Sequence, residues 1–155
     1  MKILKYLAIA VVVIAAIVAL VAPIGPMPGF FIGGTTAEAP ARWPDTSATH
    51  EIRLRVPGAP PRVVIIWVVE HENDLHVVGS KGTGWVSMIG QGSPVEMRLG
   101  DETYPLTAVP VTEGWQAVVT AWRDKYRADY PELVDGFPDM AEAAATVAVF
   151  RLERG

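Results

Sequence analysis

The sequence predicts a mainly β (α+β) protein in which an N-terminal transmembrane helix precedes a six-stranded antiparallel barrel with one amphipathic helix. Three observations predict it: a single apolar run opens the chain, several short runs alternate apolar and charged residues, and one later stretch repeats apolar residues with a helical period. The predicted division is an anchor at residues 1–22, a proline- and glycine-rich connector at 23–49 and one domain at 50–155.

The first of these observations concerns the N-terminus, where Lys5 is the only charge between Ile3 and Ala22. As a helix rising ~1.5 Å per residue, residues 3–22 match the ~30 Å hydrocarbon core, so we expect them to cross a lipid bilayer. A cleaved signal peptide looks similar, but Pro23 directly after Ala22 disfavours cleavage there. Lys2 and Lys5 precede the run, which predicts a single-pass cell-membrane protein with a cytoplasmic N-terminus and a periplasmic or extracellular domain.

Net charge and cysteine content narrow the function classes. The chain has 13 basic and 17 acidic residues, so without Lys2 and Lys5 the rest carries 11 − 17 = −6. This balance argues against a nucleic-acid partner, whose phosphates require a basic face. Because the chain has no cysteine, disulfides, a thiolate nucleophile and a cysteine-based zinc site are excluded.

The connector at residues 23–49 contains five prolines and four glycines, which disfavour both helix and regular strand. Its first half is nevertheless apolar at Met27, Phe30, Phe31 and Ile32. Either these residues anchor at the lipid headgroup zone or they pack against another protein. We expect docking onto the domain to begin at Trp43-Pro44.

Six strands are predicted from alternation, β-branched runs and turn residues. Residues 50–56 alternate apolar with charged side chains, and residues 63–69 form a continuous run typical of a central strand. Pro105 and Pro110 favour an edge or a bulge for the fifth strand. The predicted strands are His50–Val56, Val63–Val69, Leu75–Ser80, Val95–Leu99, Glu102–Val111 and Thr146–Leu152.

The amphipathic helix is predicted over Glu113–Tyr130, with Thr112 as its N-cap and Pro131 as its stop. A short helix at Gly84–Gly92 separates the third and fourth strands, and another begins near Pro138. The apolar stripe of the amphipathic helix must be buried against the sheet. Its members are Trp115, Val118, Val119, Trp122 and Tyr126.

This element order, with GSKGTGW at residues 79–85 and LGDETYPL at residues 99–106, resembles the pyridoxamine 5'-phosphate oxidase-like split barrels over residues 52–152. That superfamily includes flavin- and deazaflavin-dependent oxidoreductases, and some membrane-anchored members look similar to the whole chain. The resemblance implies a cradle for the phosphate of FMN or a deazaflavin. Its residues would be Ser80, Lys81, Gly82, Thr83 and Gly84, with Trp85 packed beneath them.

A glycine-containing turn with exposed N–H groups, a lysine and a helix N-terminus suits an anion. The same residues also suit an ordinary strand-to-helix turn with one solvated lysine. His71 and His76 flank a predicted hairpin, where their side chains can approach one another, and Glu70 or Glu72 could supply a third metal ligand. Hairpin ends are normally polar and solvated, so no metal site is predicted.

The sequence leaves two functions open. The first is an accessory or structural subunit of a membrane protein complex, with the barrel on the extracytoplasmic face. The alternative is a membrane-tethered flavin- or deazaflavin-dependent oxidoreductase. The sequence contains no catalytic motif that decides whether the chain is an enzyme, and it leaves open whether two barrels pair as a homodimer.

Overall fold

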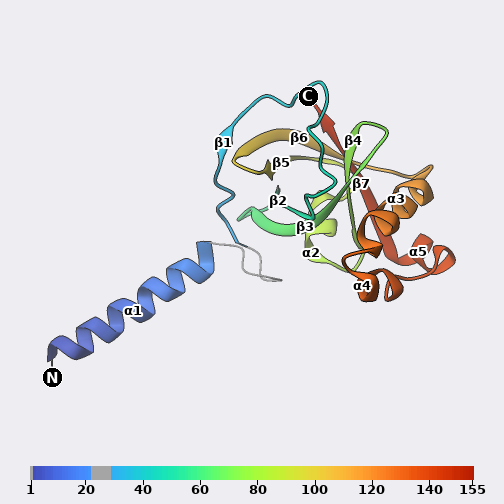
Figure 1. Cartoon of the computed structure of the whole chain (residues 1–155). Helices are drawn as coiled ribbons and strands as arrows, with labels where there is room; N and C mark the ends of the chain where they lie inside the picture. The colour runs from blue at the N-terminus through green and yellow to red at the C-terminus, as the bar shows by residue number, and fades with distance from the viewer. Residues whose placement is uncertain (1, 22–28) are drawn as a thin grey trace.

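The computed structural model describes residues 2–21 and 29–155, and Figure 1 shows how their elements are arranged. The elements are α1 Lys2–Val21, β1 Thr35–Thr36, β2 Glu51–Val56, β3 Arg62–His71, β4 Asp74–Ser80, α2 Gly84–Ile89, β5 Ser93–Leu99, β6 Glu102–Pro110, α3 Trp115–Arg127, α4 Pro131–Asp135, α5 Met140–Thr146 and β7 Val147–Arg154.

Strands β2 to β7 form a six-stranded antiparallel barrel, which confirms the predicted architecture. The strands follow the order β6-β5-β2-β3-β4-β7, and pairing of β6 with β7 closes the ring. Closure leaves no long unpaired strand edge around the barrel. The two-residue strand β1 adds to β6 in parallel, which the sequence pattern did not predict.

Strand β6 corrects the expectation of an edge strand. One side of β6 pairs with β5 from Glu102 to Ala108, while the other pairs first with β1 and then with β7. Pro105 falls between the residues that pair with β1 and those that pair with β7. A proline, which has no N–H to donate, is tolerated at this change of partner.

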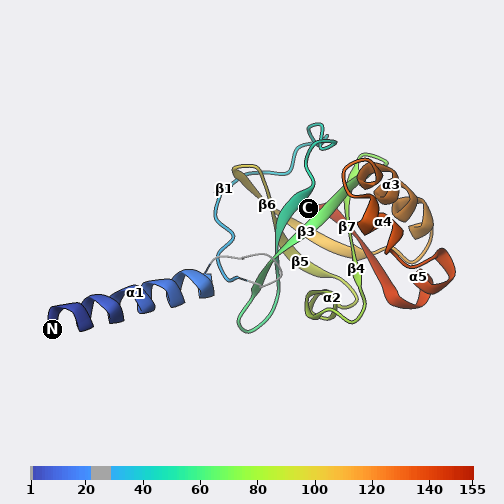
Figure 2. The same cartoon turned by 60° about the horizontal axis from the view of Figure 1, so that its bottom comes forward.

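Two apolar cores stabilise the domain. The first fills the barrel with inward-facing residues such as Leu54, Leu75, Met97 and Leu152. The second lies outside the barrel, where α3 and α4 cover β3, β4 and β7. Figure 2 shows α3, α4 and α5 together on one side of the barrel. Four members of the predicted helical stripe, Val118, Val119, Trp122 and Tyr126, are therefore confirmed as buried in this second core, while Trp115 is only partly buried against it.

The helix boundaries differ from the prediction at three points. Helix α3 begins after Gly114, whose φ of 70° glycine adopts easily, so Thr112 is not its N-cap. Pro131 begins α4 as a first-turn residue. The last helix begins at Met140, because the Asp139 carboxylate accepts bonds from the Ala141 and Glu142 N–H groups.

Helix α1 stands apart from the barrel in Figure 1, and its side chains between residues 3 and 18 are exposed. Over residues 2–21 and 29–155, no helix is both long and apolar enough to cross a membrane. The span predicted for residues 3–22 is therefore not supported.

The second half of the connector belongs to the folded domain. Gly29 and Val63 exchange backbone hydrogen bonds of 2.8 Å, and the Thr103 hydroxyl donates to Gly33 O at 2.6 Å. Trp43 is 3 % exposed and packs edge-to-face on Tyr104 with ring centroids 5.2 Å apart. Docking thus begins at Gly29, earlier than the predicted Trp43, while residues 23–28 of the predicted connector lie outside the described residues.

Candidate functional site

The predicted phosphate cradle forms one tight turn between β4 and α2. Ser80 Oγ accepts a bond from Gly82 N at 3.3 Å, and the Thr83 hydroxyl donates to Ser80 O at 2.7 Å. Thr83 N also donates to Ser80 O, and Lys81 N donates to Thr146 O at 2.8 Å. The structure therefore brings Ser80, Lys81, Gly82 and Thr83 together, with the N–H groups of the last three directed at oxygens of the chain itself.

Lys81 supplies the positive charge expected of a phosphate site. Its ammonium donates to Ala144 O near the end of α5, at a distance of 2.8 Å. A side-chain nitrogen at a helix C-terminus satisfies a carbonyl that has no partner within the helix. Lys81 thereby ties the turn to α5, and binding an anion would require the ammonium to share or leave this contact.

Trp85 and Gly84 complete the predicted set at the start of α2. The Trp85 ring lies directly over Gly79, where an added Cβ would come within 2.1 Å of Cζ2, and its centroid is 5.9 Å from that of Phe150. Open space surrounds the α-carbon of Gly84. Apolar packing of Trp85 on the barrel therefore holds the turn, while Gly84 leaves one side of it accessible.

A pocket of about 480 Å³ lies next to this turn, between α2, the start of α3 and β7. Lys81, Ser87 and Gln91 supply its polar side chains, and Trp115 and Phe150 supply aromatic walls. This volume and the mostly apolar lining with a few polar groups are typical of small-molecule sites. Of the residues predicted to bind a cofactor, Lys81 alone lines this pocket.

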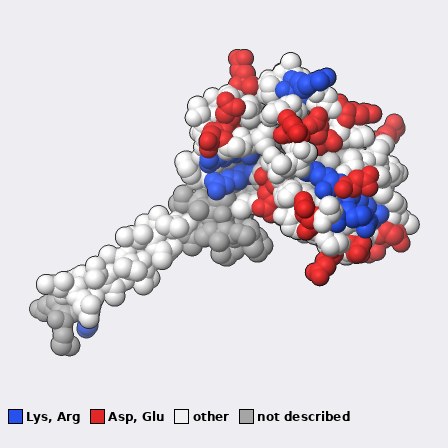
Figure 3. Space-filling view, viewed as in Figure 1, with Lys and Arg blue, Asp and Glu red and all other residues white. Residues whose placement is uncertain are grey.

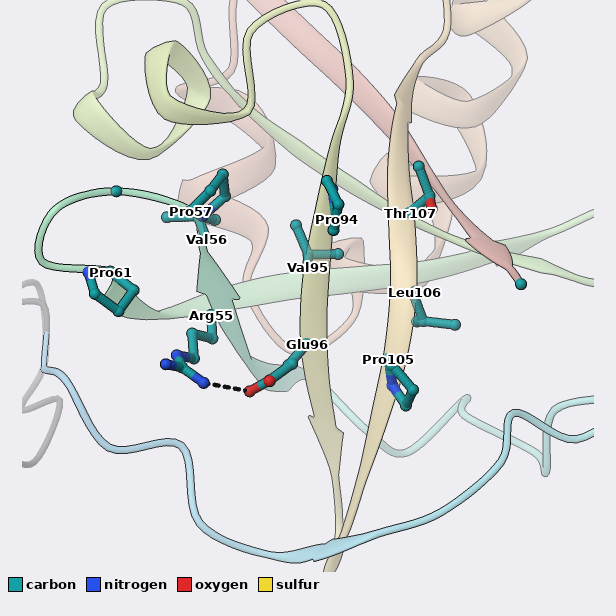
Figure 4. A pocket seen from close by; sticks show the side chains of 12 residues that line it. Arg55, Val56, Pro57, Pro61, Pro94, Val95, Glu96, Pro105, Leu106 and Thr107 are labelled. Carbon is teal, nitrogen blue, oxygen red and sulfur yellow. Dashed lines mark hydrogen bonds and ion pairs between the residues drawn. The ribbon is translucent and has the colours of Figure 1, made fainter.

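A second pocket, of about 610 Å³, lies at β2, β5 and β6 and is shown in Figure 4. Arg55 and Glu96 face each other there on neighbouring strands, with an Nη1–Oε2 distance of 2.9 Å. Four prolines contribute to its lining. Because Arg55 and Glu96 pair with each other, neither of these two charges is free to orient a charged ligand.

The two histidines of the β3–β4 hairpin approach each other as expected, with ring centroids 6.0 Å apart. Burial lowers the pKa of His76, and its Nδ1 contacts Asp74 O at 3.1 Å. In the part of the chain that the structure describes, no group of three or more His, Cys, Asp or Glu residues is placed to hold a metal ion.

The sequence analysis missed Lys125 of α3, the most heavily hydrogen-bonded lysine side chain in the described structure. Its ammonium donates to Thr46 O, Thr49 O and Val68 O at 2.9, 2.8 and 2.8 Å. Burial lowers its pKa to about 8, and Glu70 and Asp45 oppose that shift. Lys125 therefore joins the connector, β3 and α3.

Comparisons with known proteins show the fold of the chain. No family model matches it, and no curated protein matches it. The heme storage protein HutZ from Vibrio cholerae matches with a TM-score of 0.50 and 16 % identity, covering 70 % of this chain and 84 % of HutZ. A NimC/NimA family protein from Clostridium acetobutylicum matches with a TM-score of 0.46 and 19 % identity, over 66 % and 73 % of the two chains. The chain thus has the split-barrel fold.

Proposed function

We propose that this chain is a membrane-attached split-barrel protein that serves as an accessory subunit of a membrane protein complex. The observation that carries the proposal is the exposed apolar surface of α1. Ile3 is 85 % exposed and Val12 67 %, although they lie on opposite sides of the helix. Continuous apolar surface of this extent is unfavourable in water and favourable in contact with lipid or with other apolar helices.

The side of the membrane follows from the lysines. Lys2 and Lys5 precede the apolar run, and the next charge in the sequence is Glu38. For a crossing that includes the residues beyond α1, the positive-inside bias keeps such an N-terminus in the cytoplasm, and we therefore propose the extracytoplasmic face for the barrel. A fluorescent reporter that matures only in the cytosol, fused after Gly155, tests this arrangement. Signal from that fusion would overturn the assigned side and the crossing it requires.

The role as a subunit is tested through the small residues of α1. Ala8 and Ala15 are seven residues apart and therefore share one face, where small side chains let a neighbouring helix approach closely. Replacing both with leucine should release the chain from its complex, while Val13→Leu with Ile17→Leu on the opposite face should not.

The measurement is the native mass of the full chain after mild detergent extraction from its own membranes. We expect a mass well above that of the 16.7 kDa chain, reduced in the alanine-face variant alone. A chain that migrates alone without any substitution would refute the accessory role.

A second candidate function is a tethered oxidoreductase that uses a flavin or deazaflavin. The pocket of about 480 Å³ that Lys81 lines favours it, because Lys81 and Ser87 are suitable partners for a phosphate at the rim of an apolar site. If such a cofactor binds there, it supplies the hydride chemistry, and the chain supplies orientation through Lys81 and apolar contact through Trp115.

Adding FMN or a deazaflavin to the purified full chain and recording visible absorption tests this candidate. Saturable spectral change that is weakened at least tenfold by Lys81→Ala would support it. Lys125→Arg, at a lysine far from this pocket, is the matched control. Absence of saturable binding would exclude the oxidoreductase and leave the accessory role untouched.

A further inference from the structure

Two phenylalanines are held outward at the start of the docked connector. Phe31 is 64 % exposed and Phe30 36 %, whereas Ile32, the next residue, is 8 % exposed and packs onto the barrel. The backbone around them is fixed by the Gly29–Val63 bonds and by the Arg98 Nη1 bond to Ile32 O at 3.2 Å. The exposure of the two rings is therefore built into the fold.

Arginines surround these rings. The Arg62 guanidinium lies 6.0 Å from the centre of the Phe30 ring, within reach of a cation–π contact. Phe31 and Arg98 flank Gly33, since a Cβ built on that glycine would meet Phe31 Cε1 at 3.3 Å and Arg98 Nη1 at 2.6 Å. In Figure 3 one group of basic side chains lies on the side of the barrel nearest α1, with acidic side chains close to it, and other basic side chains lie elsewhere on this face.

A pair of like charges lies in the same region. Arg53 of β2 and Arg98 of β5 are directly opposite each other, an arrangement that by itself destabilises a sheet, although Arg98 also holds the connector through Ile32 O. Both line a hollow of about 310 Å³, together with Glu51. Asp101 Oδ1 lies 3.5 Å from Arg98 Nη2 but is fully exposed, so it offsets little of this charge.

We propose that this surface, formed by Phe30, Phe31, Arg53, Arg62 and Arg98, docks the barrel onto the phospholipid headgroups of the membrane that holds α1. The proposal rests on the membrane attachment proposed above. The phenyl rings enter the boundary between headgroups and acyl chains, and a lipid phosphate binds in the hollow that Arg53 and Arg98 line.

Chain length supports lipid as the occupant. Val21 and Gly29 are separated by 29 − 21 = 8 peptide links, which reach at most about 29 Å. The docked rings therefore stay close to the end of α1, whose exposed side chains favour lipid. The barrel is thus oriented with the β2–β5 face toward the bilayer and with α3, α4 and α5 away from it.

Single cysteines provide the test, because the chain contains none. Nitroxide labels on Phe31→Cys, Val12→Cys and Leu133→Cys in the full chain are compared in vesicles of phosphatidylcholine and phosphatidylglycerol in equal parts. Leu133 in α4 is a matched control, since it is an apolar side chain 40 % exposed on the helix side of the barrel. Collision rates with oxygen and with a water-soluble nickel chelate give the depth of each label.

We expect the label at residue 12 in hydrocarbon, the label at residue 31 at the depth of the phosphates and the label at residue 133 in water. Adding Arg53→Gln should shift residue 31 toward water, while Arg127→Gln on α3 should not. A label at residue 31 that is in water, or shielded from both reagents by protein, overturns the headgroup contact while leaving attachment intact. A label at residue 12 in water overturns the attachment itself.

Discussion

Lys81 and Lys125 illustrate how differently two lysines can be used in one small barrel. Lys81 lies on a turn that the sequence marks clearly, and its ammonium contacts one carbonyl, Ala144 O. Lys125 lies inside a helix that the sequence marks only as amphipathic, and its ammonium contacts three carbonyls from two segments. The predicted turn motif therefore contains Lys81, which makes one side-chain hydrogen bond. Lys125, which makes three, lies outside any motif.

The difference follows from what surrounds each side chain. The Lys81 turn is stabilised by its own short-range hydrogen bonds and by the Trp85 ring packed on Gly79, so the charge contributes little. Around Lys125, the ammonium adds three bonds to the carbonyls of Thr46, Thr49 and Val68, in segments that Val68 N and His50 O also join. Buried acceptors that lose their donor are expensive, so the charge is structurally important there.

The largest expected effect is the loss of the Lys125 ammonium. Lys125→Met keeps the length of the side chain but removes three charge-assisted hydrogen bonds, although Thr46 O keeps the Thr49 N–H and Val68 O keeps the Tyr126 hydroxyl as donors. It should lower the free energy of unfolding by about 1.5–3 kcal/mol. Urea unfolding of the full chain in detergent, followed by near-ultraviolet circular dichroism of the tryptophans, measures it. Lys81→Met is the matched control, with an expected loss below about 1 kcal/mol. Equal losses of unfolding free energy in Lys125→Met and Lys81→Met would contradict the greater structural importance of Lys125.

The turn should instead be sensitive to apolar packing. Gly79→Ala places a methyl group within 2.1 Å of the Trp85 ring, so the indole or the strand must move. Overpacking of this kind lowers the free energy of unfolding by about 1–3 kcal/mol. Gly82→Ala in the same turn is the control, because its nearest neighbour would be 3.7 Å away. Comparable stability of the two variants would show that Trp85 adapts without cost.

The sequence predicted the barrel well because each strand shows its own local signal. The alternating sequence of β2 and the β-branched run of β3 both form strands in the structure. The apolar residues of β2 are buried, and its charged residues are more exposed. The docked connector could not be predicted in this way. Thr35 and Thr36 pair with Glu102 and Thr103, far along the chain, through backbone groups that all residues share.

The sequence indicates the role of Lys125 only weakly, through its position in α3. Lys125 comes seven residues after Val118 and directly before Tyr126, so it lies at the border of the buried stripe of α3. A charged residue at such a position is either a long side chain that reaches solvent or a buried charge with several partners. Only the position of residues 46–49, which comes from tertiary structure, decides between the two.

The smallest expected effect is a pH dependence that belongs to Lys125. Burial lowers its pKa in the folded state to about 8, from a usual value of 10.5. Between these values the unfolded chain holds the proton and the folded chain releases it, so this group makes folding more favourable as pH rises. The difference in unfolding free energy between the unmodified chain and Lys125→Met should therefore grow from pH 7.5 to pH 9.5, with other titrating groups cancelling in the subtraction. A difference that shrinks over this range would mean that the three carbonyls bind the ammonium more strongly than burial disfavours it.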